Sequence, residues 1–150
     1  MPSTIAFPSN ASWVHTMALD VQIFDTDCFG VMWHGAYLKW MEMGRTKLLE
    51  DLGISIALPG ETNGHIYPVA EQSLKFKNRA PYREPLILTT RLEVESFKLL
   101  FSQTFRSAND DRVTLDALTT VLILDGEWKI QRRLPAFLQE ALANGLSPSS

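Results

Sequence analysis

Residues 24–46 read FDTDCFGVMWHGAYLKWMEMGRT, and this stretch decides the fold. Its first part, from Asp25 to Gly30, consists of turn-forming residues that interrupt regular structure. From about His34 onward, apolar side chains recur at three- and four-residue intervals, as on one face of a helix: Tyr37, Leu38, Met41, Leu48, Leu49 and Leu52. Gly53 favours a helix end. Such a helix would measure roughly 28 Å, and its apolar character predicts that a sheet wraps around it.

Most of the chain on either side of this helix carries the alternating pattern of β-strands. The predicted strands cover about residues 14–24, 66–79, 86–97, 98–107 and 113–124. Asn109-Asp110-Asp111 separates the last two strands, and Asp125-Gly126 marks a further tight turn. Pro135 opens a predicted short helix that ends at Gly145. This order predicts an α+β fold in which an antiparallel sheet curls around one long helix.

The length and the composition fit one globular domain. A chain of 150 residues that is 45% apolar and 21% charged can bury a single core. We expect residues 1–13 to form a flexible arm, residues 14–145 to form the domain and residues 146–150 to be a frayed tail. No apolar run approaches the roughly 20 residues that cross a bilayer, and the first residues lack the features of a secretory signal. The expectation is a cytoplasmic protein with no membrane span.

Charge and cysteine content argue against several classes of function. The 14 Lys and Arg residues against 17 Asp and Glu residues give a net charge of −3, which disfavours a nucleic-acid partner. Cys28 is the single cysteine, so an internal disulfide and a cysteine-rich zinc site are excluded. His15, His34 and His65 lie too far apart in sequence for a local metal-ligand pattern. We therefore expect no metal site.

The residues that could carry chemistry gather where the turn meets the helix. Asp25 and Asp27 place two carboxylates before the helix that His34 opens, and Gly30 permits an unusual backbone angle. A helix N-terminus offers unpaired N–H groups and a positive dipole end, which stabilise developing negative charge. A carboxylate beside it can attack an acyl group or activate water. The alternative is that both aspartates are only turn and cap residues, and residue types alone favour that alternative.

The same residues form a recognisable pattern. Asp25-Thr26-Asp27, Gly30-Val31, His34 and Tyr37 resemble the D-T-D-x-x-G-V-x-x-H-x-x-Y signature of hotdog-fold acyl-CoA thioesterases of the 4-hydroxybenzoyl-CoA thioesterase and YbgC type. The helix also carries the E-x-x-R-T of that family, at Glu42, Arg45 and Thr46. The resemblance implies the hotdog fold, with an antiparallel β-sheet around a long central α-helix. It also implies hydrolysis of an acyl-CoA thioester, with coenzyme A as part of the substrate and no separate cofactor.

The resemblance also implies residue roles. Asp27 corresponds to the catalytic carboxylate, acting as nucleophile or general base, and the backbone N–H at His34 polarises the thioester carbonyl while the His34 side chain assists. Asp25 resembles a structural partner that holds the loop. The residues expected to bind the substrate or its CoA part are Gly30, Val31, Trp33, Tyr37, Tyr67, Pro68, Val69 and Lys98. Among these, Pro68 and Val69 would line the acyl pocket of the adjoining subunit, so a homodimer or homotetramer is implied.

Several alternatives stay open. The acyl group could be a small aromatic one, of the 4-hydroxybenzoyl-CoA or 1,4-dihydroxy-2-naphthoyl-CoA type, or a short aliphatic chain. The protein could instead be an acyl-carrier-protein thioesterase, or a non-catalytic module that binds acyl-CoA or acyl-carrier protein. Glu42 could be a second acid, although a helix-face pair with Arg45 or a dimer contact is the favoured interpretation. Cys28 could be a nucleophile, although an incidental thiol is the simpler explanation.

Overall fold

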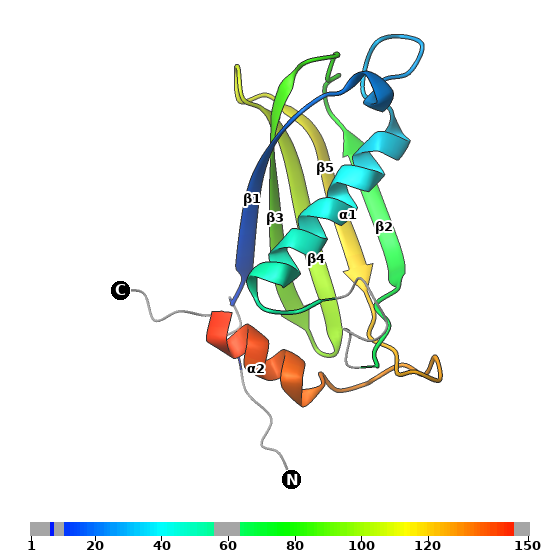
Figure 1. Cartoon of the computed structure of the whole chain (residues 1–150), viewed down its shortest axis with the longest axis vertical. Coiled ribbons are helices and arrows are strands. Elements are labelled where there is room, and N and C mark those ends of the chain that lie inside the picture. Colours follow the sequence, from blue (N-terminus) through cyan, green and yellow to red (C-terminus); the bar gives the residue numbers. More distant parts are fainter. Residues whose placement is uncertain (1–6, 8–10, 56–63, 146–150) are drawn as a thin grey trace.

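The computed structural model describes residue 7 and residues 11–55 and 64–145, which fold as an antiparallel sheet with two α-helices (Figure 1). Its five strands follow the order β1-β3-β4-β5-β2, so β1 and β2 form the two edges. The strands are β1 (Trp13–Asp20), β2 (Val69–Phe76), β3 (Pro85–Glu95), β4 (Lys98–Ser107) and β5 (Val113–Val121). The helices are the single-turn 3-10 helix η1 (Ile23–Asp25), α1 (His34–Asp51) and α2 (Ala136–Gly145). The predicted α+β class and the antiparallel sheet are confirmed.

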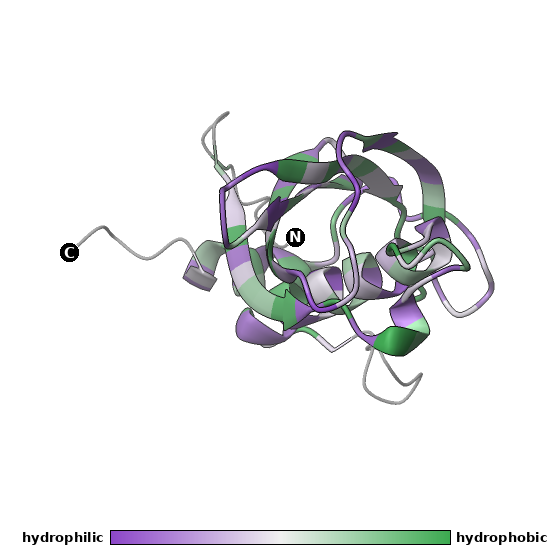
Figure 2. Cartoon of the chain, turned by 90° about the horizontal axis from the view of Figure 1, so that it is seen from above, coloured by the Kyte–Doolittle hydropathy of each residue, from purple (hydrophilic) through white to green (hydrophobic). Residues whose placement is uncertain are grey.

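Helix α1 lies across one face of the sheet, and the sheet curves around it when the molecule is viewed from above (Figure 2). The helix ends where the sequence predicts, because Gly53 adopts a positive φ of 78° directly after the cap residue Leu52. Its buried face includes Tyr37, Met41 and Leu48. Each large apolar side chain that is fully buried in this way stabilises the fold by about 1.5–3 kcal/mol.

The core consists of two clusters that follow the two halves of α1. The cluster at the N-terminal half contains Tyr37 and Met41 with side chains of β3, β4 and β5 such as Leu86, Phe105 and Leu115. The cluster at the C-terminal half joins the end of α1 to the opposite ends of the strands and to α2. Its larger members are Trp13, Leu48, Leu49, Leu92, Leu99, Phe101, Ile123, Leu138 and Leu142. The cluster against which a residue packs therefore shows which end of α1 that residue is near.

The first strand differs from its prediction at both ends. Trp13, which the sequence assigns to the arm, begins β1 and is buried, and its indole N–H donates to the Leu142 carbonyl of α2 at 2.9 Å. At the other end β1 stops at Asp20 instead of Phe24, because the chain turns into η1. Phe24 is consequently 74% exposed. The arm residues 1–6 and 8–10 and the tail 146–150 lie outside the described residues.

Two other segments are less regular than their pattern predicts. The strand predicted over residues 66–79 is restricted to β2, and Ile66 makes only an isolated bridge to Leu124. Leu38 lies on the predicted apolar face of α1, yet it is 36% exposed and faces out of the core.

No helix within the described residues combines the length and apolarity that a membrane span requires.

Candidate active site

Asp25, the first aspartate of the DTD motif, fixes the segment that leads into α1. Its side chain is only 3% exposed, and its carboxylate accepts hydrogen bonds from the Gln22 backbone N–H at 2.9 Å and the Trp40 indole N–H at 3.2 Å. The Asp25 carbonyl also accepts a bond from the Trp33 N–H at 3.1 Å. Because these bonds connect η1 with the cap and the second turn of α1, Asp25 sets the position of the loop relative to the helix.

Asp27, the second aspartate, is exposed and belongs to a tight loop of residues 27–31. One carboxylate oxygen, Oδ1, accepts the N–H of Phe29 at 2.8 Å and faces the N–H of Val31 at 3.5 Å. The Asp27 N–H in turn donates to the Val31 carbonyl at 3.0 Å, and Gly30 closes the loop with a φ of 78°. Within the described residues the second oxygen, Oδ2, has no hydrogen-bond partner. The loop therefore orients the carboxylate and leaves one oxygen available.

The N-terminus of α1 begins three residues beyond this loop and offers free donors. Trp33 is the N-cap residue, with an extended backbone and no side-chain capping bond, and the first turn has no acidic residue. The Trp33 carbonyl accepts the N–H groups of Ala36 and Tyr37. In the described part of the chain, the N–H groups of His34 and Gly35 have no partner. Two donors and the positive end of the helix dipole are thus available for a developing negative charge.

Trp33 forms an aromatic wall over this first turn. Its indole ring lies so close to Gly35 that a Cβ built there would lie 2.2 Å from the ring. The ring also packs edge-to-face on the imidazole of His34 at 5.2 Å, and it remains 40% exposed. Glycine at position 35 is therefore required for Trp33 to take this position beside the free N–H groups.

Tyr37, the last residue of the signature, lies in the core. It is 1% exposed and packs edge-to-face against Phe105 at 4.9 Å and Phe76 at 5.8 Å. Burial raises the pKa of its phenol, and the Thr114 hydroxyl partly offsets that rise. The side chain is thus neutral and packs into the core below the first turn of α1, and a contact between Tyr37 and a substrate stays a prediction.

The other predicted binding residues lie at the opposite end of α1. Val69, which begins β2, pairs with Val121 of the C-terminal core cluster, whereas Phe76 at the end of β2 touches Tyr37. Pro68 precedes Val69 and accepts the Leu122 N–H at 3.0 Å through its carbonyl. Since α1 spans about 27 Å at 1.5 Å per residue, one chain does not bring these residues together with Asp27 and His34.

Lys98 also lies at this far end, where β4 begins. Its ammonium lies 5.8 Å from the centre of the Phe97 ring, and the guanidinium of Arg132 lies 5.7 Å from the same ring. Phe97 and Lys98 line a surface pocket of about 470 Å³ with Ile130. A CoA contact of Lys98 stays a prediction, whereas Arg132 and Phe97 were not singled out, because the sequence indicates the turn at Asp125-Gly126 but not which strand the chain meets after it.

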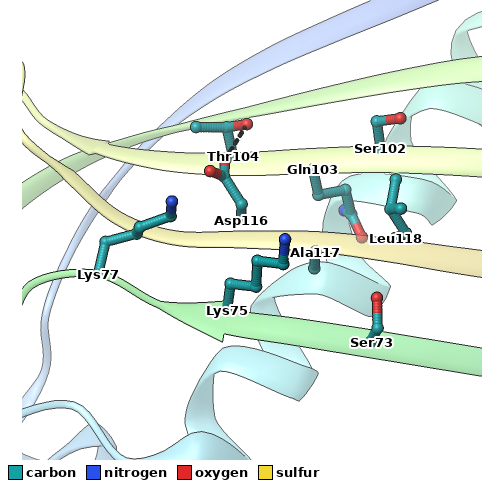
Figure 3. Close-up of a pocket in the computed structure, with 9 residues that line it drawn as sticks. All are labelled: Ser73, Lys75, Lys77, Ser102, Gln103, Thr104, Asp116, Ala117 and Leu118. Carbon is teal, nitrogen blue, oxygen red and sulfur yellow. Dashed lines mark hydrogen bonds between the residues drawn. The ribbon is translucent and has the colours of Figure 1, made fainter.

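A second surface depression, of about 250 Å³, lies on the face of the sheet away from α1 (Figure 3). Lys75 and Lys77 extend over it beside Asp116, whose carboxylate accepts the Thr104 hydroxyl at 2.8 Å. The sheet itself separates this depression from α1. These two lysines therefore do not join the Asp27 and His34 site within one chain.

Arg45 differs most from its prediction. The sequence favours a helix-face pair with Glu42 or a dimer contact, but Arg45 is 8% exposed, and its Nη1 donates to the Gln103 side-chain oxygen at 3.2 Å. No carboxylate among the described residues lies within 4.0 Å of it. Burial lowers the pKa of Arg45, and the negative charge of Glu42 only partly counteracts this. Helical spacing from Met41 and Leu48 places Arg45 on the buried face of α1, so the prediction followed its charge and not its position.

Comparison with known proteins supports the resemblance at the level of the thioesterase-like superfamily, while the 4-hydroxybenzoyl-CoA thioesterase and YbgC type stays a prediction. The sequence model of the thioesterase-like superfamily matches residues 21–143. The chain is 33% identical over 84 residues to "Putative acyl-CoA thioesterase YneP" of Bacillus subtilis (strain 168), a match that covers 55% of this chain and 60% of YneP. The chain thus spans less than two thirds of YneP. It is 29% identical over 132 residues to "Putative esterase sll0410" of Synechocystis sp. (strain ATCC 27184 / PCC 6803 / Kazusa), covering 87% and 78% of the two chains.

Solved structures agree on the fold. The 1,4-dihydroxy-2-naphthoyl-CoA thioesterase Slr0204 from Synechocystis superposes with a TM-score of 0.77 over 89% of this chain and 97% of its own, at 18% identity. At that identity the likeness concerns the fold, which is the predicted hotdog fold. Relatives and structural neighbours are named as acyl-CoA thioesterases. Because the family match covers most of the chain, this protein belongs to the thioesterase-like superfamily.

Proposed function

We propose that the protein hydrolyses acyl-CoA thioesters, with Asp27 and the N-terminus of α1 as the reacting site. One observation carries the proposal: the exposed Asp27 carboxylate lies in a loop that ends three residues before His34. Within the described residues, neither its Oδ2 nor the N–H groups of His34 and Gly35 have a hydrogen-bond partner. A thioester hydrolase needs a carboxylate or an activated water, and donors for the oxyanion, within reach of one carbonyl.

In the proposed reaction the thioester carbonyl accepts hydrogen bonds from the N–H groups at the start of α1. Asp27 Oδ2 then attacks the carbonyl carbon, or it removes a proton from a water molecule that attacks. In the first route a mixed anhydride with Asp27 forms as the carbon–sulfur bond breaks, and water then hydrolyses the anhydride; in the second route the water oxygen bonds to the carbon directly as the carbon–sulfur bond breaks. In both routes coenzyme A leaves as a thiolate that takes up a proton supplied by the water. In sum, thioester and water give a carboxylate, free CoA and one proton. Both routes use the same donors, because each passes through an oxyanion on the carbonyl oxygen.

A homodimer would complete the site. Strand β2 is an edge strand whose side chains are mostly exposed, and a free edge favours pairing with another strand. Pairing of two β2 strands across a two-fold axis is antiparallel, so Val69 of one subunit would lie beside the Phe76 end of the other. Phe76 touches Tyr37, one helical turn from His34. Pro68, Val69 and Tyr67 would thereby approach the Asp27 of the second subunit.

The CoA part of the substrate would be held by Lys98, helped by Arg132. Both cations flank the Phe97 ring, an arrangement that suits phosphate groups next to a nucleobase. The acyl group would be a small aromatic or a short aliphatic one. Trp33, at the start of α1, and Tyr67, from the other subunit, would offer aromatic rings on either side of it. A cytoplasmic location accords with a CoA substrate and remains a prediction.

A panel of acyl-CoA substrates, followed by release of free thiol, tests the proposal. We expect hydrolysis of several aromatic or short-chain acyl-CoAs, and less hydrolysis of the same acyl groups on acyl-carrier protein. Tight binding of every panel member without thiol release would refute the enzymatic proposal and favour a binding module. Light scattering after size exclusion measures the subunit number, and a monomer would contradict the shared site.

A further inference from the structure

Arg45 is a buried cation without a carboxylate partner in the described part of the chain. Its guanidinium carries five N–H donors, yet among the described residues its side chain makes one hydrogen bond, the 3.2 Å contact with the neutral Gln103. The residue is 8% exposed, and burying a charge without a counter-charge is costly. A bound ligand with a negative charge would supply the missing counter-charge for Arg45.

The side chain of Gln103 is held firmly for this contact. Its amide donates to the Met41 carbonyl at 2.8 Å and to the Thr90 hydroxyl at 2.9 Å, so its oxygen must face Arg45. Gly44 allows the helix to approach this group, because a Cβ there would lie 2.6 Å from the Thr90 hydroxyl. The guanidinium is therefore oriented by a fixed hydrogen-bond network on the sheet and not by a flexible neighbour.

Beyond Arg45 lies a cavity of about 70 Å³ between α1 and the segment that enters β2. It is lined by Glu42, Arg45, Thr46, Leu49, Tyr67, Val69, Phe101 and Val121. The hydroxyl of Tyr67 is buried and has no hydrogen-bond partner, and burial raises its pKa to about 12, so it remains a donor. At roughly 30 Å³ per water molecule, the volume fits a group as small as a carboxylate.

We propose that this cavity binds a carboxylate at the far end of the acyl group, which accepts hydrogen bonds from Arg45 and Tyr67. The preferred substrates are then acyl-CoAs that carry a second carboxyl group. This inference rests on the proposed function, because it is the pairing of two β2 strands that places Tyr67 and Val69 beside the Asp27 and His34 of the other subunit.

The surroundings of the cavity contain one opposing charge. Glu42 is exposed at the rim, and its carboxylate lies more than 4.0 Å from the guanidinium. It helps to keep Arg45 protonated but repels an incoming anion. The other lining residues are apolar or carry only a hydroxyl, so Arg45 and Tyr67 are the groups of the cavity that favour a carboxylate.

Two matched thioether analogues test this without requiring hydrolysis. 4-Carboxybenzyl-CoA and 4-methylbenzyl-CoA have the same shape but differ in charge, and calorimetry gives the ratio of their dissociation constants. We expect the wild-type protein to bind the carboxylate analogue at least about tenfold more tightly, as charge-assisted hydrogen bonds provide. Equal affinity for the two analogues would overturn the inference.

Two conservative variants assign the preference to this cavity. Tyr67→Phe removes only the hydroxyl, and Arg45→Lys keeps the charge but loses the planar fork; each should lower the affinity ratio several-fold. Tyr82→Phe, which removes the hydroxyl of an exposed tyrosine, is the matched control and should leave the ratio unchanged. If the affinity ratio were unchanged in both cavity variants, ligand binding in this cavity would be contradicted. If the variants changed only the number of subunits, the occupant of the cavity would be an acidic side chain of a second copy of the chain.

Hydrolysis of 4-carboxybenzoyl-CoA and 4-methylbenzoyl-CoA separates the two proposals. Thiol release from both at equal kcat/KM supports the proposed function and refutes the carboxylate preference. A tenfold or larger difference in analogue binding, with no thiol release from either thioester, supports the cavity assignment and refutes the enzymatic proposal.

Discussion

The loop of residues 27–31 and the loop of residues 125–129 have the same hydrogen bonds in different surroundings. In each loop the aspartate oxygen Oδ1 receives the N–H groups two and four residues later, at 2.8 and 3.5 Å for Asp27 and at 2.8 and 3.0 Å for Asp125. Each aspartate N–H donates to the carbonyl four residues later. In each loop the fourth residue has a positive φ, 78° at Gly30 and 66° at Trp128.

The two loops differ in the segment that each one enters. The first loop leads into the N-terminus of α1, where the N–H groups of His34 and Gly35 have no partner among the residues that the structure describes. The second loop leads to Ile130 and an isolated bridge with Leu124. An aspartate in such a loop is therefore first of all a structural feature. A chemical role for Asp27 depends on the helix terminus beside it, which Asp125 lacks.

Replacing the aspartate of each loop by asparagine should produce the largest difference in activity between the two loops. Asn keeps the oxygen that accepts the backbone N–H groups but cannot act as nucleophile or base, so Asp27→Asn should lower kcat by about a thousandfold or more. Asp125→Asn should stay within about twofold of wild type. Thiol release from the best acyl-CoA measures both, and an Asp27→Asn protein of normal activity would disprove the proposed mechanism.

Crowding the start of α1 should have the next largest effect. Gly35→Ala places a Cβ inside the Trp33 ring position, so the indole must move from the first turn. We expect kcat/KM to fall about tenfold, a loss of about 1.4 kcal/mol of transition-state stabilisation. Gly126→Ala in the second loop is the control, since its nearest contact would be an ordinary 3.6 Å. Equal kcat/KM for both variants would show that the Trp33 position does not matter.

Exchanging the residues of positive φ tests the backbone of the two loops. Gly30→Ala forces a Cβ into the left-handed region and should lower the free energy of unfolding by about 1 kcal/mol. Trp128 already bears this strain with a side chain 70% exposed, so Trp128→Gly should raise the free energy of unfolding by about 0.5 kcal/mol. Urea denaturation measures both, and the same sign for the two changes would contradict the argument.

The smallest effect should be a pH dependence in the second loop. The backbone N–H groups of Lys129 and Glu127 hold the pKa of Asp125 below its ordinary value of 3.8. Because the folded-state pKa is depressed, this carboxylate stabilises the fold above the unfolded pKa, and the contribution is lost as the pH falls through the folded pKa. Asp125→Asn should therefore lose less stability than wild type between pH 6 and pH 3 in denaturant titrations. Parallel losses would exclude the effect.

Local sequence was sufficient for α1 and for most of the sheet. The helix end at Gly53, the hairpin at Asn109-Asp110-Asp111 and the strands β3 and β4 lie within one or two residues of their predictions. Local pattern was misleading where tertiary contacts compete with it: Phe24 continues an apolar pattern but lies in η1, because the Asp25 carboxylate binds Gln22 and Trp40.

The two halves of the candidate site also differ in how far the sequence predicted them. Its first half, from Asp25 to Tyr37, is contiguous in the chain, so the motif predicted which residues share a loop and a helix start. The second half was predicted only through family resemblance, and within one chain it lies at the other end of α1. For Arg45 the spacing from Met41 and Leu48 indicates the buried face, but its partners on that face, Gln103 and Thr90, come from the sheet and no pattern within the helix encodes them.

The sequence by itself determined the order of strands and helices, the family and the position of the two loop aspartates, because these depend on local periodicity, turn residues and a short motif. Only the tertiary structure decided that Pro68, Val69 and Lys98 lie, within one chain, at the end of α1 opposite to Asp27 and His34. It also decided that Arg45 is buried without a counter-ion among the described residues and that Tyr67 faces the same cavity. Those properties arise from segments that are distant along the chain and adjacent in space, which no local pattern encodes.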